Sequence, residues 1–248
     1  MTDYLVLAAA AFFAGMLNTV AGGGTFLTFP ALVYTGVPVV AANATSAVAV
    51  FPGYLAGAAG FRREIVTFDR TRLVKIVAAT AIGGLIGSVL LLVSSNEAFS
   101  AVVPFLLALA TLAFAFGDKI RDWAQRHSFG SAEGPVGTVL VSIYGGYFNG
   151  GLGIVLLALF SLWGMRDINL MNGLKNGLSF VLSAISVATF ALAGLVAWPQ
   201  ALVMMVAATA GGYAGAPLAR ALPRSFVRAV VIVVGAAMSA IFFWRLFA

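Results

Sequence analysis

Long apolar stretches separated by short polar segments dominate this chain. An α-helix needs about 20 predominantly apolar residues to cross the roughly 30 Å hydrocarbon core of a bilayer. Stretches that reach about this length, the last one marginally, are 38–61, 73–93, 98–117, 168–197, 198–219 and 226–247. The pattern therefore predicts an all-α polytopic membrane protein.

Shorter apolar stretches form two pairs, each around a glycine-rich interruption: 4–17 with 25–36, and 136–148 with 152–163. We call residues 18–25 the first break and residues 145–153 the second break. Interrupted helix is tolerated at membrane depth only where it is buried in protein or lines a polar cavity, so each break marks a candidate site. The sequence leaves open whether each pair is one discontinuous span or a re-entrant hairpin. The residues singled out are Asn18, Gly22, Gly23, Gly24 and Thr25, and Asn149, Gly150 and Gly151.

The two halves of the chain align with each other. The matched positions are Asn18 with Asn149, 42–46 with 172–176, and 83–87 with 211–215. The offset between them drifts only from 131 to 128 residues, which predicts an internal duplication. Separately, the Gly-x-x-x-Gly spacings at 53–57, 83–87 and 211–215 predict close contacts between helices.

Loop charge predicts opposite orientations for the two halves. Segment 62–75 is strongly basic, whereas its counterpart 194–199 is uncharged. The 94–97 loop carries only Glu97, whereas its counterpart 220–228 carries arginines. Because basic loops face the cytoplasm, we expect two inverted repeats, each with one glycine-broken segment plus three spanning helices, about eight membrane segments in all. The predicted organisation is a first repeat at 1–117, a cytoplasmic linker at 118–135 and a second repeat at 136–248.

Composition strengthens the membrane assignment. The chain is 62% hydrophobic and 9% charged, with a mean hydropathy of +1.05, whereas soluble domains carry about 25% charged residues. The formal net charge is +6. The basic residues lie in short loops, as the positive-inside rule expects, and not on one soluble face as in a nucleic-acid binder. We therefore expect contact with the lipid bilayer and none with nucleic acid.

Groups for catalysis or metal binding are sparse. Cysteine is absent, the single histidine, His127, lies in the predicted linker, and the acidic residues fall in loops or at helix ends. Metal sites and nucleophilic catalysis need several such groups together, so we expect no enzyme activity, no metal and no cofactor. Cation and proton-driven carriers usually place a carboxylate in the membrane, and the apolar stretches contain none.

The breaks suit an anion better than a cation. A helix that restarts after Gly24 directs its free N–H groups and the positive end of its dipole at the break, which makes an anion site. The Thr25 hydroxyl adds a hydrogen-bond donor. The alternative is that the glycines only allow close helix packing.

A polar stripe follows one face of the 168–197 helix, formed by Asn172, Lys175, Asn176, Ser179, Ser183 and Ser186. Asn43, Thr45 and Ser46 are the matching polar group in the first half. A charge such as Lys175 inside an apolar stretch is a functional hypothesis by default. Its head group can equally snorkel to the cytoplasmic interface, and the sequence leaves both interpretations open.

In their order along the chain, these motifs resemble the sulfite exporter TauE/SafE family, also called the 4-toluene sulfonate uptake permease family. The resemblance rests on residues 15–30, 42–46, 52–53, 60–64, 145–153 and 172–176. It implies a multi-pass permease of the bacterial inner (plasma) membrane with a two-repeat fold. It also implies sulfur-containing anions as substrates, such as sulfite, sulfoacetate or other organosulfonates. The family often has Asn where this chain has Ser46, whose hydroxyl can still donate a hydrogen bond.

We therefore predict a transporter of small sulfur-containing oxyanions, with its site at the midplane between the two repeats. The ligand groups are expected from both breaks, from Asn43, Thr45 and Ser46, and from Lys175 and Asn176. Two other functions stay open: an anion channel, and a membrane assembly subunit that transports nothing. A homodimer is one assembly open to such a protein.

Overall fold

The computed structural model describes residues 2–20, 23–127, 135–221 and 224–247, and this part of the chain is helical apart from short connections. Its helices are α1 (Thr2–Val20), α2 (Thr25–Tyr34), α3 (Val39–Gly60), α4 (Arg62–Val66), α5 (Arg70–Val93), α6 (Asn96–Arg126), α7 (Pro135–Tyr147), α8 (Leu152–Leu162), α9 (Ile168–Leu192), α10 (Trp198–Ala221) and α11 (Arg224–Phe247). The prediction of an all-α protein is confirmed.

Several helices have the length and composition of membrane spans. Among the described residues, these are Val39–Gly60, Arg70–Val93, Asn96–Ala113 and Ile168–Leu192. Shorter apolar helices cover Thr2–Asn18, Thr25–Tyr34, Leu152–Leu162 and Ile232–Trp244. The predicted stretches 198–219 and 226–247 form α10 and α11, whose side chains are only partly described. The arrangement is that of a multi-pass membrane protein.

Helix α6 extends beyond the apolar stretch predicted at 98–117. It continues to Arg126, through the first part of the segment predicted as a linker. Residues 118–126 include lysine, arginine, alanine and glutamine, which are good helix formers. The apolar stretch therefore marks the part of α6 suited to lipid, not the full length of the helix.

Local sequence sets many helix ends. The side-chain oxygens of Asp69, Ser95 and Asp167 accept hydrogen bonds from first-turn backbone N–H groups of α5, α6 and α9, which satisfies donors that have no partner within the helix. Gly36 and Gly164 follow α2 and α8 with φ angles of 85° and 80°. Glycine adopts this left-handed conformation without steric cost, so it ends helices cleanly.

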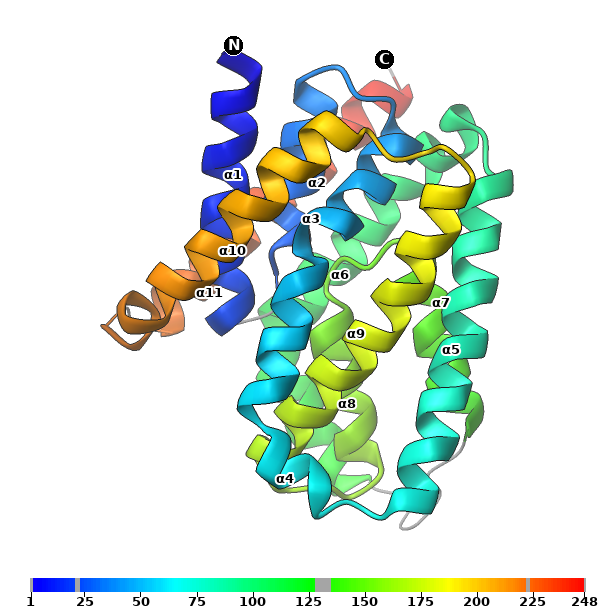
Figure 1. The fold of residues 1–248 in the computed structure, drawn as a ribbon, viewed down its shortest axis with the longest axis vertical. Coiled ribbons are helices and arrows are strands. Elements are labelled where there is room, and N and C mark those ends of the chain that lie inside the picture. The colour runs from blue at the N-terminus through cyan, green and yellow to red at the C-terminus, as the bar shows by residue number, and fades with distance from the viewer. Residues whose placement is uncertain (1, 21–22, 128–134, 222–223, 248) are drawn as a thin grey trace.

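Both glycine-broken segments are hairpins. In Figure 1, α1 descends from the N-terminus at the upper end and α2 returns to that end, whereas α7 rises from the lower end and α8 runs back down. The two arms of each hairpin also pack against each other. The sequence left the choice between a discontinuous span and a hairpin open, and the structure has a hairpin in both places, entered from opposite ends.

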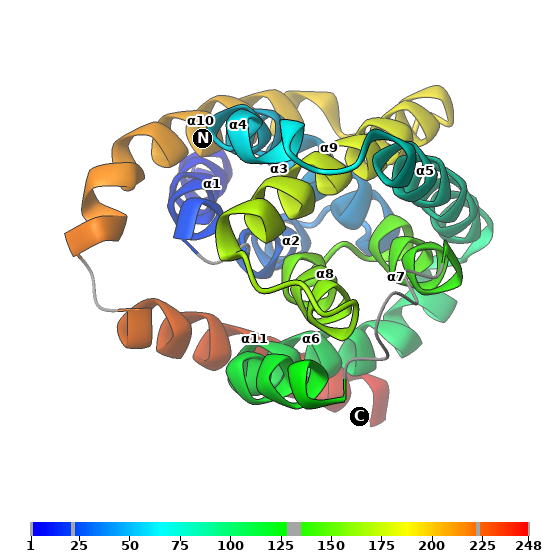
Figure 2. The same cartoon turned by 90° about the horizontal axis from the view of Figure 1, so that it is seen from below.

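Helices of the two halves pack in reciprocal pairs. Helix α1 packs on α10 and α5 packs on α7, while α3 packs on α9 and α6 packs on α11. The view from below shows α11 beside α6, and α1 beside α10 (Figure 2). Each half therefore places its broken hairpin against a long helix of the other half.

Glycines allow the closest of these contacts. A Cβ atom built on Gly83 of α5 would lie 2.7 Å from the Ser142 Cβ of α7, and one on Gly211 of α10 would collide with the Phe12 backbone of α1. The close helix contact predicted at 83–87 is thereby confirmed. Gly53 itself has open space around it, whereas a Cβ atom on Gly57 would lie 2.8 Å from the Asn176 amide of α9, so in the 53–57 spacing only the second glycine lies at a close helix contact.

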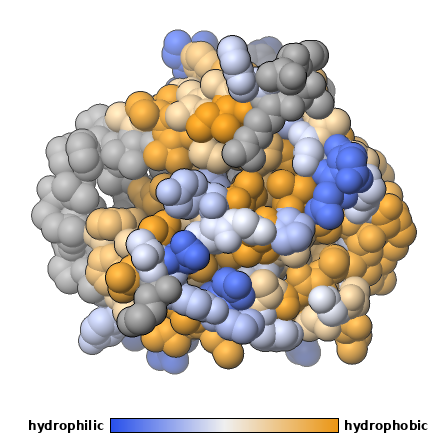
Figure 3. Space-filling view, turned by 90° about the horizontal axis from the view of Figure 1, so that it is seen from above, coloured by the Kyte–Doolittle hydropathy of each residue, from blue (hydrophilic) through white to orange (hydrophobic). Residues whose placement is uncertain are grey.

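The surface separates apolar sides from a more polar end. Large apolar side chains exposed along the helices include Leu85, Val89, Phe105, Leu109 and Val206. Seen from above, hydrophilic residues gather across the upper end among apolar ones (Figure 3). Apolar flanks of this kind face hydrocarbon in a bilayer, where every backbone group must already be paired inside the protein.

Candidate functional site

At the first break, a side chain from the end of α1 pairs with the backbone where α2 begins. The Gly24 N–H group donates a hydrogen bond to Asn18 Oδ1 at 2.7 Å, so Asn18 at the end of α1 caps the start of α2. A Cβ atom on Gly24 would lie 2.6 Å from Asn18 Nδ2, which explains why glycine stands there. Gly23 and Gly24 are buried, and Gly22 lies outside the described residues.

The first turn of α2 is tied to α3. The Thr28 hydroxyl donates to the Gly24 carbonyl at 3.2 Å and lies 2.6 Å from Ser46 Oγ. Thr28 and Ser46 are fully buried, and Thr25 is 6% exposed. The Thr28 hydroxyl, the Gly24 carbonyl and the Ser46 hydroxyl are therefore paired with one another.

The second break depends on backbone conformations that few residues adopt. Asn149 has a φ of 62° and Gly151 has a φ of 71°. Asparagine tolerates this left-handed region better than most side chains, and glycine tolerates it freely. The Asn-Gly-Gly sequence at 149–151 thus matches the sharp turn between α7 and α8.

Hydrogen-bond donors cover carbonyl groups of the second break. Asn43 Nδ2 of α3 donates to the Tyr147 carbonyl at 2.8 Å, and the Tyr144 hydroxyl donates to the Gly150 carbonyl. The sequence did not single out Tyr144. A tyrosine inside an apolar stretch is a signal for such a role, because a buried hydroxyl usually finds a hydrogen-bond partner.

Asn149 itself is buried without a partner. Its side chain is 7% exposed, and neither Nδ2 nor Oδ1 makes a hydrogen bond within the described part of the chain. The Tyr54 hydroxyl of α3 lies beside this amide, but without hydrogen-bond geometry. An unpaired buried amide is destabilising by about 1–3 kcal/mol, and native proteins keep such groups for a reason.

The second break lies next to α2 and α3, the helices that follow the first break. Asn43 and Ser46 lie one helical turn apart on α3, and the first reaches the second break while the other reaches α2. The Phe148 ring of the second break packs edge-on against Phe29 of α2, with centroids 5.9 Å apart. Residues more than 100 positions apart in the sequence therefore share one buried region.

Two of the predicted site residues have other contacts. Thr45 Oγ1 accepts the Ala197 N–H group at 3.0 Å, so Thr45 anchors the connection that leads into α10. Asn176 lies against Gly57 of α3, where a Cβ atom would be 2.8 Å from its amide. Asn176 therefore lies at the α3–α9 contact, and Thr45 is engaged at the start of α10.

Lys175 lies beside the second break. Its side-chain carbon Cδ is 3.2 Å from the place a Cβ atom would take on Gly153, in the first turn of α8. Within the described part of the chain, no hydrogen bond or ion pair to its ammonium group is present. Lys175 is seven residues into α9, about 10 Å along the helix, and it is partly buried.

The serines of the polar stripe on α9 are buried. Ser179, Ser183 and Ser186 are each 2% exposed or less, and Ser186 accepts a hydrogen bond from Ser88 of α5 at 2.8 Å. Among the described residues, no group of three or more histidine, cysteine or carboxylate side chains is placed to hold a metal ion. The polar chemistry of this region is thus carried by amides, hydroxyls and one amine.

Comparison with known proteins gives a consistent picture. The chain is 28% identical over 243 residues to a "Probable membrane transporter protein" of Haemophilus influenzae, covering 95% of this chain and 92% of that protein. It is 28% identical over 244 residues to "Probable membrane transporter protein YfcA" of Escherichia coli K12, covering 95% and 87%. It is 25% identical over 233 residues to "Probable membrane transporter protein ORF9" of a Sinorhizobium species, covering 93% and 88%.

No solved structure matches the chain significantly. The model of the sulfite exporter TauE/SafE family matches residues 7–242, which includes both breaks, α3 and the polar stripe on α9. The match covers nearly the whole chain and agrees with the motifs quoted above. This chain therefore belongs to the sulfite exporter TauE/SafE family.

Proposed function

We propose that this protein is a secondary transporter of small sulfur-containing oxyanions, such as sulfite or organosulfonates, and that it binds them at the second break, between the two halves of the chain. The observation that carries the proposal is the second break, where the buried amide of Asn149 has no partner among the described residues and precedes α8, and where Lys175 lies against the first turn of that helix. The names of the family and of the relatives support transport and sulfite chemistry.

The electrostatics of the second break favour an anion over a cation. A cation would need the carbonyl oxygens there, but donors already occupy those of Tyr147 and Gly150. The N-terminal N–H groups of α8 carry the positive end of the helix dipole, and Lys175 adds a full positive charge. Described acidic residues near the membrane ends, such as Asp69, Glu97 and Asp167, lie at helix starts and not beside the breaks.

The sequence singles out candidate binding groups in both halves of the chain: Asn18, Gly22, Gly23, Gly24, Thr25, Asn43, Thr45, Ser46, Asn149, Gly150, Gly151, Lys175 and Asn176. Of these, the proposed site uses the groups at the second break, which are Asn149, Gly150, Gly151 and Lys175. Backbone N–H groups and side-chain donors suit sulfite and sulfonate oxygens, since charge-assisted hydrogen bonds to oxyanions are about twice as strong as neutral ones.

Two inverted repeats account for the arrangement of the helices. The reciprocal pairing of α1 with α10 and of α5 with α7 supports this organisation, as do the hairpins that enter from opposite ends (Figure 1). The repeats would cover 1–117 and 136–248, joined by a cytoplasmic linker at 118–135. Rocking of one repeat against the other then exposes the site to each side in turn.

Flux into proteoliposomes tests the function. We expect saturable uptake of at least one of sulfite, sulfoacetate, taurine and sulfate, with faster uptake when the same anion is loaded inside. A channel gives flux that does not saturate and no acceleration by exchange, and a non-transporting assembly subunit gives no flux. Uptake of a metal cation with no response to the sulfur anions would contradict the proposal.

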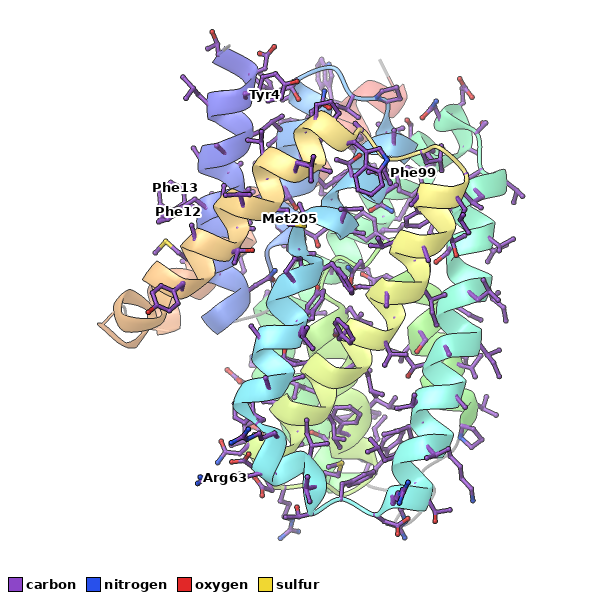
Figure 4. All side chains as sticks on the ribbon, viewed as in Figure 1. Tyr4, Phe12, Phe13, Arg63, Phe99 and Met205 are labelled. Carbon is purple, nitrogen blue, oxygen red and sulfur yellow. The ribbon has the colours of Figure 1, made fainter. Side chains whose placement is uncertain are left out.

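Labelling of single cysteines tests the topology. Arg63 lies at the lower end and Tyr4 at the upper end (Figure 4), and both Arg63 and Glu97 are exposed. Because basic loops are retained in the cytoplasm, we expect a membrane-impermeant thiol reagent on intact cells to label Glu97→Cys and not Arg63→Cys. Both variants should react after permeabilisation, which is the control. Labelling of Arg63→Cys in intact cells would reverse the orientation.

A further inference from the structure

We propose that the two breaks have different tasks: the second break holds the anion through Asn149, while the first break is a fixed cap in which Asn18 positions α2. This division rests on the proposed function, and it separates two asparagines that occupy matched places in the sequence. Asn149 becomes a ligand residue, and Asn18 becomes a positioning residue that the anion does not contact.

Several polar groups at the first break are already paired with one another. The Asn18 side-chain oxygen is used by the Gly24 N–H group, and the Thr28 hydroxyl is used by the Gly24 carbonyl and Ser46. An anion that took the Gly24 N–H group would have to displace the Asn18 oxygen. The Gly24 N–H group, the Asn18 side-chain oxygen and the Thr28 hydroxyl are therefore paired within the protein, without a ligand.

At the second break, side chains donate hydrogen bonds to backbone carbonyl groups, but the Asn149 side chain has no partner among the described residues. Tyr144 and Asn43 donate to the carbonyls of Gly150 and Tyr147. The Asn149 amide is 7% exposed and unpartnered, directly before an eleven-residue helix, α8. A helix N-terminus with a buried free donor beside it is a site that an oxyanion completes.

The difference follows from backbone conformation. Asn18 ends α1 and its side chain points back to the chain that restarts at Gly24, so the amide and the N–H group pair locally. Asn149 is held at a φ of 62° within the turn, where its amide finds no such partner. The side-chain oxygen of Asn18 thus has a hydrogen-bond partner in the first break, whereas neither amide atom of Asn149 has one within the described part of the chain.

Three variants test this division by binding of sodium sulfite and sulfoacetate to the purified protein. Asn149→Gly keeps the left-handed conformation, because glycine adopts it freely, and should weaken binding by at least about tenfold. Its melting temperature should not fall, since an unpaired buried amide is removed. Asn18→Ala removes a cap and should lower the melting temperature, with affinity within about threefold of wild type. Thr25→Val, a nearly isosteric change, should leave affinity within about threefold.

The outcomes separate the two proposals. Wild-type protein that binds none of the anions would overturn the proposed function and this division with it. Wild-type binding that Asn149→Gly leaves intact would overturn the division alone. Loss of affinity in a folded Asn18→Ala or in Thr25→Val, equal to that in Asn149→Gly, would show that both breaks hold the anion. Thr25→Val keeps the test decisive if Asn18→Ala does not fold.

Discussion

Replacement of Lys175 by methionine is expected to weaken anion binding by about 10- to 100-fold. Hydrogen bonds to charged groups contribute about 1.5–3 kcal/mol each, and about 1.4 kcal/mol is a tenfold change in affinity. Methionine has a similar length and suits an apolar helix, so insertion and folding should survive. Sulfite and sulfoacetate binding to the purified protein provides the measurement.

Two control substitutions distinguish a role of Lys175 in anion binding from a role at the membrane interface. Lys75→Met makes the same change at an exposed lysine near the start of α5, and it should leave affinity unchanged. Lys175→Arg keeps the positive charge and should retain part of the affinity. If Lys175→Met binds as tightly as wild type, Lys175 snorkels to the interface and has no part in the site.

Gly146→Ala is expected to destabilise the protein by about 1–3 kcal/mol or more, the range for overpacking a tight contact. A Cβ atom at Gly146 of α7 would collide with the Gly84 carbonyl of α5 and lie 3.1 Å from the Gly84 Cα. Backbone cannot rotate away as a side chain can, so α7 must shift. Because α7 leads directly into the second break, anion affinity should fall as well.

Gly53→Ala is the matched control for this substitution. Gly53 is exposed in the interior of α3, with nothing within 4 Å of a built Cβ atom. Alanine is the better helix former by about 0.5–1 kcal/mol, so the melting temperature in detergent should hold or rise. Equal melting temperatures for wild type, Gly146→Ala and Gly53→Ala would contradict the prediction. They would show that α5 and α7 can move apart to fit the added methyl group at little cost in stability.

Much of the architecture could be read from the pattern of residues. Apolar stretches of about 20 residues have few alternatives to spanning helices, because hydrocarbon leaves no partner for unpaired backbone groups. The glycine clusters predicted both breaks, and the 83–87 spacing predicted a close helix contact. The end of α6 was harder to place, because polar helix formers continue a helix beyond the lipid-facing stretch.

The sequence by itself determined the helical membrane class, the positions of the breaks and the family motifs, because these depend on residue type and local spacing. Only the tertiary structure decided that each broken segment doubles back, that Thr45 is engaged at the start of α10, and that Asn18 is paired while Asn149 is not. Pairing of a buried polar group depends on which atoms lie within about 3 Å of it. Those atoms come from segments distant in the chain, so matched sequence positions can have different surroundings.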